Sequence, residues 1–140
     1  MLNAMSPRFS SGPDSMTKDI ETLQGRWRAI SVEVDGAAVA KHLFSDATLR
    51  VDGKRFMLRN PLPESEQRIE GTMDVGASAN PKQLTLVLDT GETVEEIYEL
   101  GPRTLKICYP TTRAGRRPTS FATAPQSGLS LVVYEKDATQ

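Results

Sequence analysis

The sequence has very few of the residues that build disulfides and metal sites. Among its 140 residues there is one cysteine, Cys108, and one histidine, His42. A disulfide within the chain needs two thiols, and neither a cysteine-based zinc site nor a poly-histidine metal centre can be built from one residue of each kind. We therefore predict no disulfide, no metal and no cofactor.

Local motifs of the large enzyme classes are also missing. The chain has no Walker loop, no dinucleotide glycine fingerprint, no His-Glu-x-x-His pair, no EF-hand loop and no Gly-x-Ser-x-Gly elbow. A nucleophilic Cys108 would need a nearby base, and the lone candidate, His42, is far away in the sequence. The favoured interpretation of Cys108 is a small buried hydrophobic residue.

The charge balance favours no electrostatic partner for the whole molecule. The formal net charge is -1, with 25% charged and 38% hydrophobic residues. No apolar run has the length of a secretory signal or a membrane helix. We expect a cytoplasmic protein with no nucleic-acid partner and no membrane partner, and the oligomeric state stays open.

The chain divides into a short polar beginning and one domain. Residues 1–16 contain Pro7, Gly12, Pro13 and several serines without periodicity, which predicts a disordered N-terminal extension. Residues 17–140 have the length of a single domain. A helix is expected over 17–24, and at about two turns it must pack on the rest of the domain to be stable.

Period-two alternation and turn signals dominate the rest of the chain. Gly25 stands where a helix ending in the left-handed conformation needs glycine, and Trp27 begins the first strand. Both faces of that strand are mixed, but if Trp27 points inward then Ser31 does too. Strands are expected over 27–34, 47–51, 55–59, 67–75, 84–88, 93–100, 104–109 and 129–136. Short connections between them predict an all-β fold: an antiparallel up-and-down β-barrel of about eight strands with a short N-terminal capping helix.

Several stretches together carry a resemblance to a known family. They are 23–27, 33–36, 97–100, 105–109, 117–121 and 127–129, with the sequences LQGRW, EVDG, IYEL, LKICY, RPTSF and SGL. The chain resembles, over about 20–136, an uncharacterised lipocalin-like, calycin-type domain common in planctomycete genomes. The resemblance implies a calycin-type barrel and no assigned activity. The loop 109–116 does not follow the family.

In lipocalin-like barrels the tryptophan that opens the first strand plugs the closed end and packs on a basic side chain of the last strand. The resemblance makes Lys136 the candidate for that partner of Trp27. The alternative is that a single tryptophan in a small domain is an ordinary core residue.

Glu95 and Glu96 fall on opposite faces of their strand, so they cannot act as a carboxylate pair. Glu96 shares a face with Tyr98. If that face is the barrel interior, the carboxylate needs a partner, which Arg117 or a ligand could supply. The alternative places Glu96 in water at the rim.

Three arginines, Arg113, Arg116 and Arg117, lie within five residues of a loop bounded by glycine and proline. Such a cluster can grip a phosphate or carboxylate by paired hydrogen bonds, or it can be a solvated loop.

These observations favour a non-enzymatic binding module that holds a small, partly apolar molecule, with a carboxylate or phosphate group as one option. The predicted ligand-binding residues are Ser31, Glu96, Tyr98, Tyr109, Arg117 and Phe121. Two alternatives remain open. One is an enzyme that uses Glu96, Tyr98 or Arg117 as acid, base or oxyanion partner, and the other is a filled barrel that binds a protein through its loops.

Overall fold

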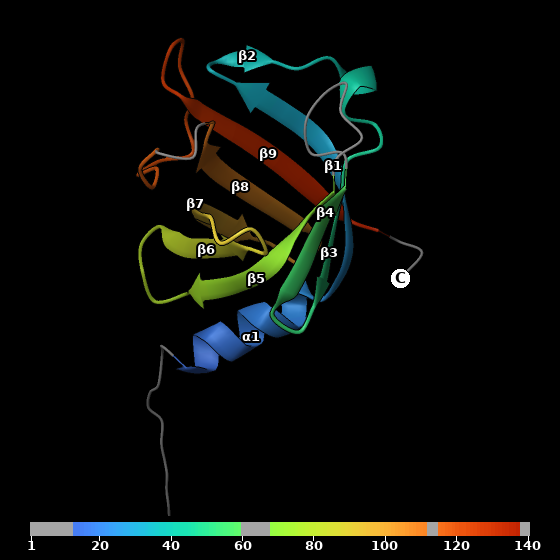
Figure 1. The fold of residues 1–140 in the computed structure, drawn as a ribbon, viewed down its shortest axis with the longest axis vertical. Coiled ribbons are helices and arrows are strands. Elements are labelled where there is room, and N and C mark those ends of the chain that lie inside the picture. The colour runs from blue at the N-terminus through green and yellow to red at the C-terminus, as the bar shows by residue number, and fades with distance from the viewer. Residues whose placement is uncertain (1–12, 60–67, 112–114, 138–140) are drawn as a thin grey trace, which may run out of the picture.

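One antiparallel sheet closes into a barrel in the computed structural model, which describes residues 13–59, 68–111 and 115–137 (Figure 1). In chain order the elements are α1 (Pro13–Leu23), β1 (Gly25–Val34), β2 (Ala37–Ala38), the 3₁₀ turn η1 (Lys41–Leu43), β3 (Thr48–Asp52), β4 (Arg55–Arg59), β5 (Arg68–Gly76), β6 (Lys82–Leu88), β7 (Thr93–Leu100), β8 (Thr104–Pro110) and β9 (Leu129–Lys136).

The strand order confirms the predicted up-and-down barrel. Following the sheet, the order is β1-β3-β4-β5-β6-β7-β8-β9, and β9 pairs back with β1 to close the ring. Every pairing among the described strands is antiparallel. The two-residue strand β2, which the sequence did not predict, pairs only with the end of β1. Closure leaves the eight barrel strands without a free edge.

The N-terminal helix begins earlier than the sequence suggested. It starts at Pro13, since proline is tolerated in the first turn where no backbone donor is required. The residues before it lie outside the described part, so the predicted extension over 1–16 is described only where its last four residues join α1. The helix ends at Leu23, and Gly25 adopts the expected positive φ of 109° before β1.

Helix α1 lies at one end of the barrel (Figure 1), and the buried Trp27 side chain packs there against the end of the helix. Its side chain is fully buried, and its Nε1 donates a hydrogen bond to the Leu23 carbonyl at 2.9 Å. The Lys136 Nζ atom lies 4.7 Å from the indole centroid and donates to the carbonyls of Thr22 and Gln24, each at 2.7 Å. The predicted packing of Trp27 on Lys136 is therefore confirmed.

A second polar contact holds α1 on the barrel. Asp19 is buried, with 9% of its surface exposed, and accepts hydrogen bonds from the Tyr98 hydroxyl and from Lys82 Nζ at 3.0 Å. Burial and the Asp19 carboxylate raise the pKa of the Tyr98 hydroxyl, which keeps it a donor.

Within the described residues, no helix has both the length and the apolar character that crossing a membrane requires.

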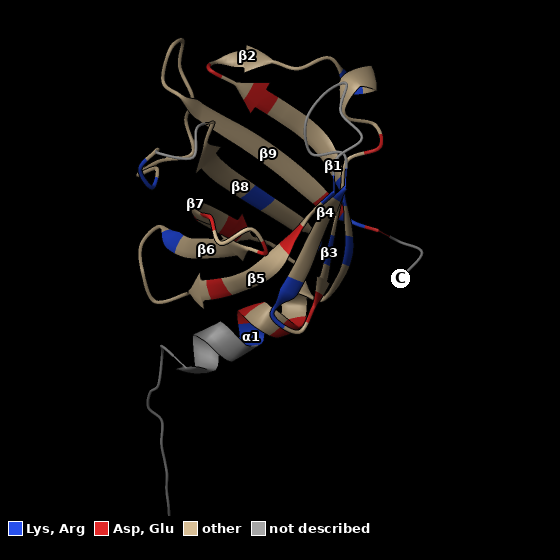
Figure 2. Ribbon diagram, in the orientation of Figure 1, with Lys and Arg blue, Asp and Glu red and all other residues tan. Residues whose placement is uncertain are grey.

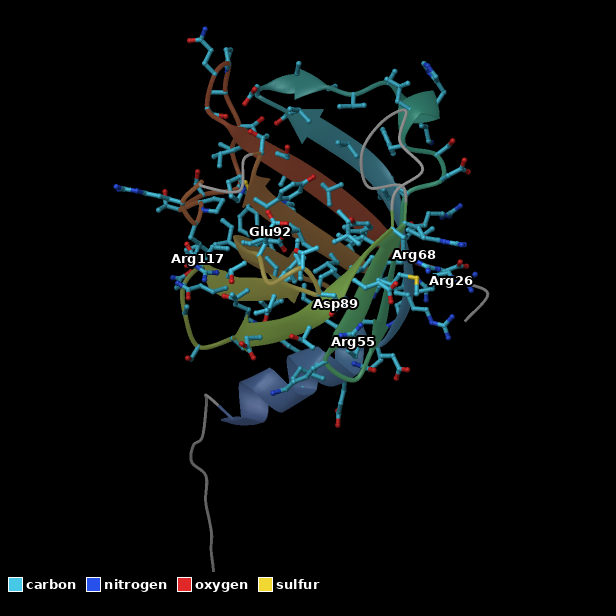
Figure 3. The ribbon with its side chains drawn as sticks, in the orientation of Figure 1. Arg26, Arg55, Arg68, Asp89, Glu92 and Arg117 are labelled. Atoms are coloured by element: carbon cyan, nitrogen blue, oxygen red, sulfur yellow. The ribbon has the colours of Figure 1, made fainter. Side chains whose placement is uncertain are left out.

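Charged side chains pair locally on the outside of the barrel. Figure 2 shows Lys and Arg residues interspersed with Asp and Glu residues on the strands and on α1. Arg55 and Asp89, which point toward each other in Figure 3, form a two-bond pair with both N–O distances at 3.0 Å. Pairs this exposed contribute little to stability.

A bulge in β1 changes which of its residues face inward. Ala29 is opposite Tyr134 and Ser31 is opposite the next residue, Val133, so Ile30 is an extra residue in β1. Ala29 is buried before the bulge and Val32 is buried after it, whereas Ser31 is exposed. Simple alternation from Trp27 put Ser31 inside, and the inserted residue moves it to the outer face.

Candidate functional site

The half of the barrel away from α1 contains a cavity of about 230 Å³. The half next to α1 is filled by buried side chains that include Leu23, Trp27, Tyr98 and Leu105. The cavity wall is mostly aliphatic and aromatic, with Phe56, Met73, Leu84, Leu86, Ile107 and Val132 among its members. Thr111, which is exposed, also belongs to the wall, so the cavity reaches the surface near the end of β8.

Strand alternation explains why this wall is apolar. On β6 every second residue, Leu84, Leu86 and Leu88, is buried and lines the cavity. The intervening residue Val87 is 39% exposed. The same period on β7 turns Glu96 inward together with Val94. Glu96 is therefore the residue whose carboxyl group faces this cavity from the described strands.

The Glu96 carboxyl group is held in an environment that suits its neutral form. Only 5% of the residue is exposed, and its Oε1 atom has no hydrogen-bond partner among the described residues. Burial raises the pKa of Glu96 to about 8, and the positive charge of Arg117 offsets part of that rise. Near neutral pH this carboxyl group is mostly protonated and is available for a hydrogen bond from inside the cavity.

Two tyrosines provide the other polar groups deep in the wall, Tyr109 on β8 and Tyr134 on β9. Burial and, after it, the Glu96 carboxylate raise the pKa of Tyr109 to about 12, while the side chain of Ser130 lowers it. Burial also raises the pKa of Tyr134, with Tyr109 and Glu96 adding to the effect. The carboxyl group and both hydroxyls thus influence one another inside an apolar wall, and both phenols stay protonated.

Arg117 lies on the outside of the barrel (Figure 3). Its Nη1 donates to the backbone carbonyls of Glu96 at 2.6 Å and Leu84 at 3.2 Å, and its Nη2 donates to Thr85 Oγ1 at 2.8 Å. The Glu95 carboxylate, on the outer face, is 3.7 Å from Nη2. The guanidinium is fixed, and it contacts the Glu96 backbone and not the Glu96 carboxylate.

The remaining predicted residues are placed away from the cavity by the connection between β8 and β9. Phe121, in that connection, lies against the outer face of β8, where Lys106 Nζ is 5.6 Å from its ring centroid. Alternation places Ile97 and Cys108, a directly opposed pair on β7 and β8, on this outer face, where both are buried. Arg117 and Phe121 anchor the connection to this side of the barrel, through the backbone of β6 and β7 and through Lys106 on β8.

Of the six residues predicted to bind a ligand, Glu96 and Tyr109 line the cavity. Tyr98 is used at the closed end by Asp19, and Ser31, Arg117 and Phe121 belong to the outside. Of the other two arginines in the cluster that could grip an anion or form a solvated loop, Arg116 is exposed and Arg113 lies outside the described residues. A ligand contact at Glu96 or Tyr109 stays a prediction.

Tyr134 is the cavity residue that the sequence did not reveal. Alternation along β9 separates Leu129, Leu131 and Val133 from Val132 and Tyr134, but it does not say which set faces inward. The register with β1 and β8 selects Val132 and Tyr134. The signal available in the sequence was that Tyr134 shares a strand face with Val132.

Among the residues that the structure describes, no group of three His, Cys, Asp or Glu side chains could hold a metal ion. Cys108 is fully buried and burial, followed by the effect of Glu96, raises the pKa of its thiol, whereas His42 is exposed on η1. This pair is not arranged for nucleophilic catalysis. Comparison of the chain with protein-family models, curated proteins and solved structures finds no match.

Proposed function

We propose that this protein binds a small, largely apolar molecule inside its barrel and acts as a non-enzymatic binding module. The observation that carries the proposal is the unfilled half of the barrel, with an apolar wall and one inward carboxyl group whose Oε1 has no partner among the described residues. A filled barrel that served only as a scaffold would place aliphatic side chains there, since an unsatisfied buried polar group destabilises the fold.

The closed end supports a kinship with calycin-type domains. Eight strands in up-and-down order and the packing of Lys136 on Trp27 are what the lipocalin-like resemblance implied. Barrels of eight strands are just wide enough to hold one small ligand. The fold therefore agrees with the proposed function, and the cavity is the proposed site of the ligand.

The cavity volume limits the size of the ligand. An engineered apolar cavity of about 150 Å³ holds benzene, and in proportion a cavity of about 230 Å³ holds on the order of nine non-hydrogen atoms. A negatively charged ligand is disfavoured, because Arg117 is outside and no lysine, arginine or histidine among the described residues lines the cavity. A carboxylate or phosphate group on the ligand was one option from the sequence, and it depended on an inward Arg117.

A catalytic role for Glu96 is the second candidate. Its pKa of about 8 would suit a general acid or base near neutral pH. Tyr109 is the nearby hydroxyl that could donate to a developing oxyanion. Binding alone remains the better-supported function, since it needs only the cavity and its wall.

Thermal stabilisation by propylbenzene tests the binding proposal. This hydrocarbon has nine carbon atoms, and a ligand that binds only the folded state raises the melting temperature. We expect a rise for the natural protein and none for Ala47→Leu, which places extra carbon atoms into the cavity from its wall. Ala38→Leu, on the exposed strand β2, is the matched control and should respond like the natural protein. No stabilisation of any of the three proteins would contradict the proposal.

A further inference from the structure

The polar groups of the cavity have one chemical character. Glu96 supplies a carboxyl group, and Tyr109 and Tyr134 supply hydroxyl oxygens. All three can accept hydrogen bonds, and no cationic side chain in the described part of the chain lines the cavity. A ligand with several donors can satisfy these oxygen atoms together.

We propose that the cavity selects small apolar amines, with the ammonium group paired to Glu96 and the hydrocarbon part against the aliphatic wall. This inference rests on the proposed function, because it assumes that the cavity is a binding site. It adds the chemical class of the ligand, which the fold by itself does not specify.

An ammonium group fits better than the other polar groups that the cavity could enclose. It carries three donors and a positive charge, so it can satisfy Oε1 of Glu96 and still donate to a tyrosine oxygen. A carboxylate would bring a negative charge into an apolar cavity that no described cation lines, and it is disfavoured. An alcohol offers one donor and no charge, so it compensates less of the desolvation of Glu96.

The groups that face Glu96 from neighbouring elements do not supply this charge. Tyr109 on β8 and Tyr134 on β9 line the same cavity, Cys108 lies on the outer face of β8, and all three side chains are neutral when protonated. Arg117 approaches from outside β6 and β7, where backbone carbonyls and Glu95 hold its guanidinium. No described cationic side chain lines the cavity beside this carboxyl group, so a ligand can pair with it from that side.

Proton release follows from this pairing. The pKa of Glu96 is about 8 in the free protein, so below that pH an ammonium ligand must displace its proton in order to form the ion pair. The affinity should rise about tenfold per pH unit up to about pH 8. It should then level off until the amine loses its own proton. An alcohol that accepts a hydrogen bond from neutral Glu96 would bind with constant affinity below about pH 8 and more weakly above it.

Calorimetric titration with three probes of equal size tests the inference. The probes are 2-phenylethylamine, 2-phenylethanol and propylbenzene, each with nine non-hydrogen atoms. At pH 8 we expect the amine to bind at least tenfold more tightly than the alcohol. In Glu96→Gln, which keeps the shape of the side chain and removes its charge, this preference should disappear while propylbenzene still binds.

The outcomes separate the two proposals. Binding of propylbenzene and the alcohol as tightly as the amine, or a preference for the amine that persists in Glu96→Gln, would overturn the amine inference and leave the binding function standing. Failure of all three probes to bind would overturn the binding function together with it. If Glu96→Gln does not fold, the pH profile of the natural protein decides, and an amine affinity that is constant between pH 6 and 8 counts against the inference.

Discussion

The ammonium group of Lys136 lies over the ring of Trp27 and at the same time caps the end of α1. Its Nζ is 4.7 Å from the ring centroid and hydrogen-bonds to the Thr22 and Gln24 carbonyls at the C-terminal end of the helix. A cation is favoured there by the helix dipole as well as by the π-face. One side chain of the last strand thereby joins the helix to the first strand.

Replacing Lys136 with methionine should lower the free energy of unfolding by about 1–3 kcal/mol, because the hydrocarbon stem is kept while the charged hydrogen bonds and the cation–π contact are lost. Lys54→Met, in the exposed turn after β3, is the control and should change stability by less than about 0.5 kcal/mol. Urea unfolding followed by Trp27 fluorescence measures both. Equal effects would show that Lys136 does not stabilise the closed end.

Arg117→Ala should lower the free energy of unfolding by about 1–3 kcal/mol, because the Glu96 and Leu84 carbonyls and Thr85 lose a charged donor. The Arg117 side chain is only 19% exposed, so water replaces it poorly. Arg116→Ala, at a neighbouring exposed position, should cost much less. Thermal melts of both variants make the comparison, and indistinguishable melting temperatures would refute the anchoring role of Arg117.

The pH dependence of stability should reveal the buried Glu96. Its pKa is about 8 in the folded protein against 4.5 in the unfolded chain. Between these values the unfolded state has lost the proton and the folded state keeps it, so stability falls as pH rises through this window and is level above it. Relative to Glu96→Gln, the natural protein should lose roughly 3 to 5 kcal/mol from pH 4.5 to 8.

Urea unfolding of both proteins at several pH values from 4.5 to 9 measures this difference. Other titrating groups are common to the two proteins, so their effects cancel in the comparison. Parallel curves for the natural protein and Glu96→Gln would mean that Glu96 ionises normally in the folded state.

Gly71 should not tolerate a side chain. A Cβ atom there would lie 2.1 Å from the Val87 carbonyl oxygen and 2.9 Å from Leu88 Cα, so backbone of β6 would have to move. Gly71→Ala should cost more than about 3 kcal/mol, since the clash is with backbone in the middle of the sheet. At Gly76 the nearest atom would be Gln83 Cβ at 3.3 Å, and Gly76→Ala should cost less than about 1 kcal/mol. Circular dichroism melts of the two variants would show whether the close approach at Gly71 matters.

Much of the fold was predictable from the sequence because its signals are local. The strands expected over 47–51, 55–59 and 84–88 correspond to β3, β4 and β6, and Leu84, Leu86 and Leu88 form the buried face of β6. Gly25 predicted the end of α1, and the structure confirms its positive φ. Short connections between such strands left few arrangements other than an antiparallel meander. The lipocalin-like resemblance further supplied the pairing of Trp27 with Lys136.

Which residues line the candidate site could not be predicted from the sequence, because it depends on how the barrel closes. One inserted residue in β1 moved Ser31 outward, and alternation could not anticipate that bulge. Alternation grouped Glu96 with Val94 and Tyr98, but only the register and closure of the sheet turned this group toward the cavity. The path of the connection after β8 placed Arg117 outside the wall, on the backbone of the residue it was expected to neutralise. The strands and their order could be predicted from local sequence signals, since these depend on neighbours along the chain. Tertiary structure alone decided which polar groups meet inside the barrel, because that depends on register between strands far apart in sequence.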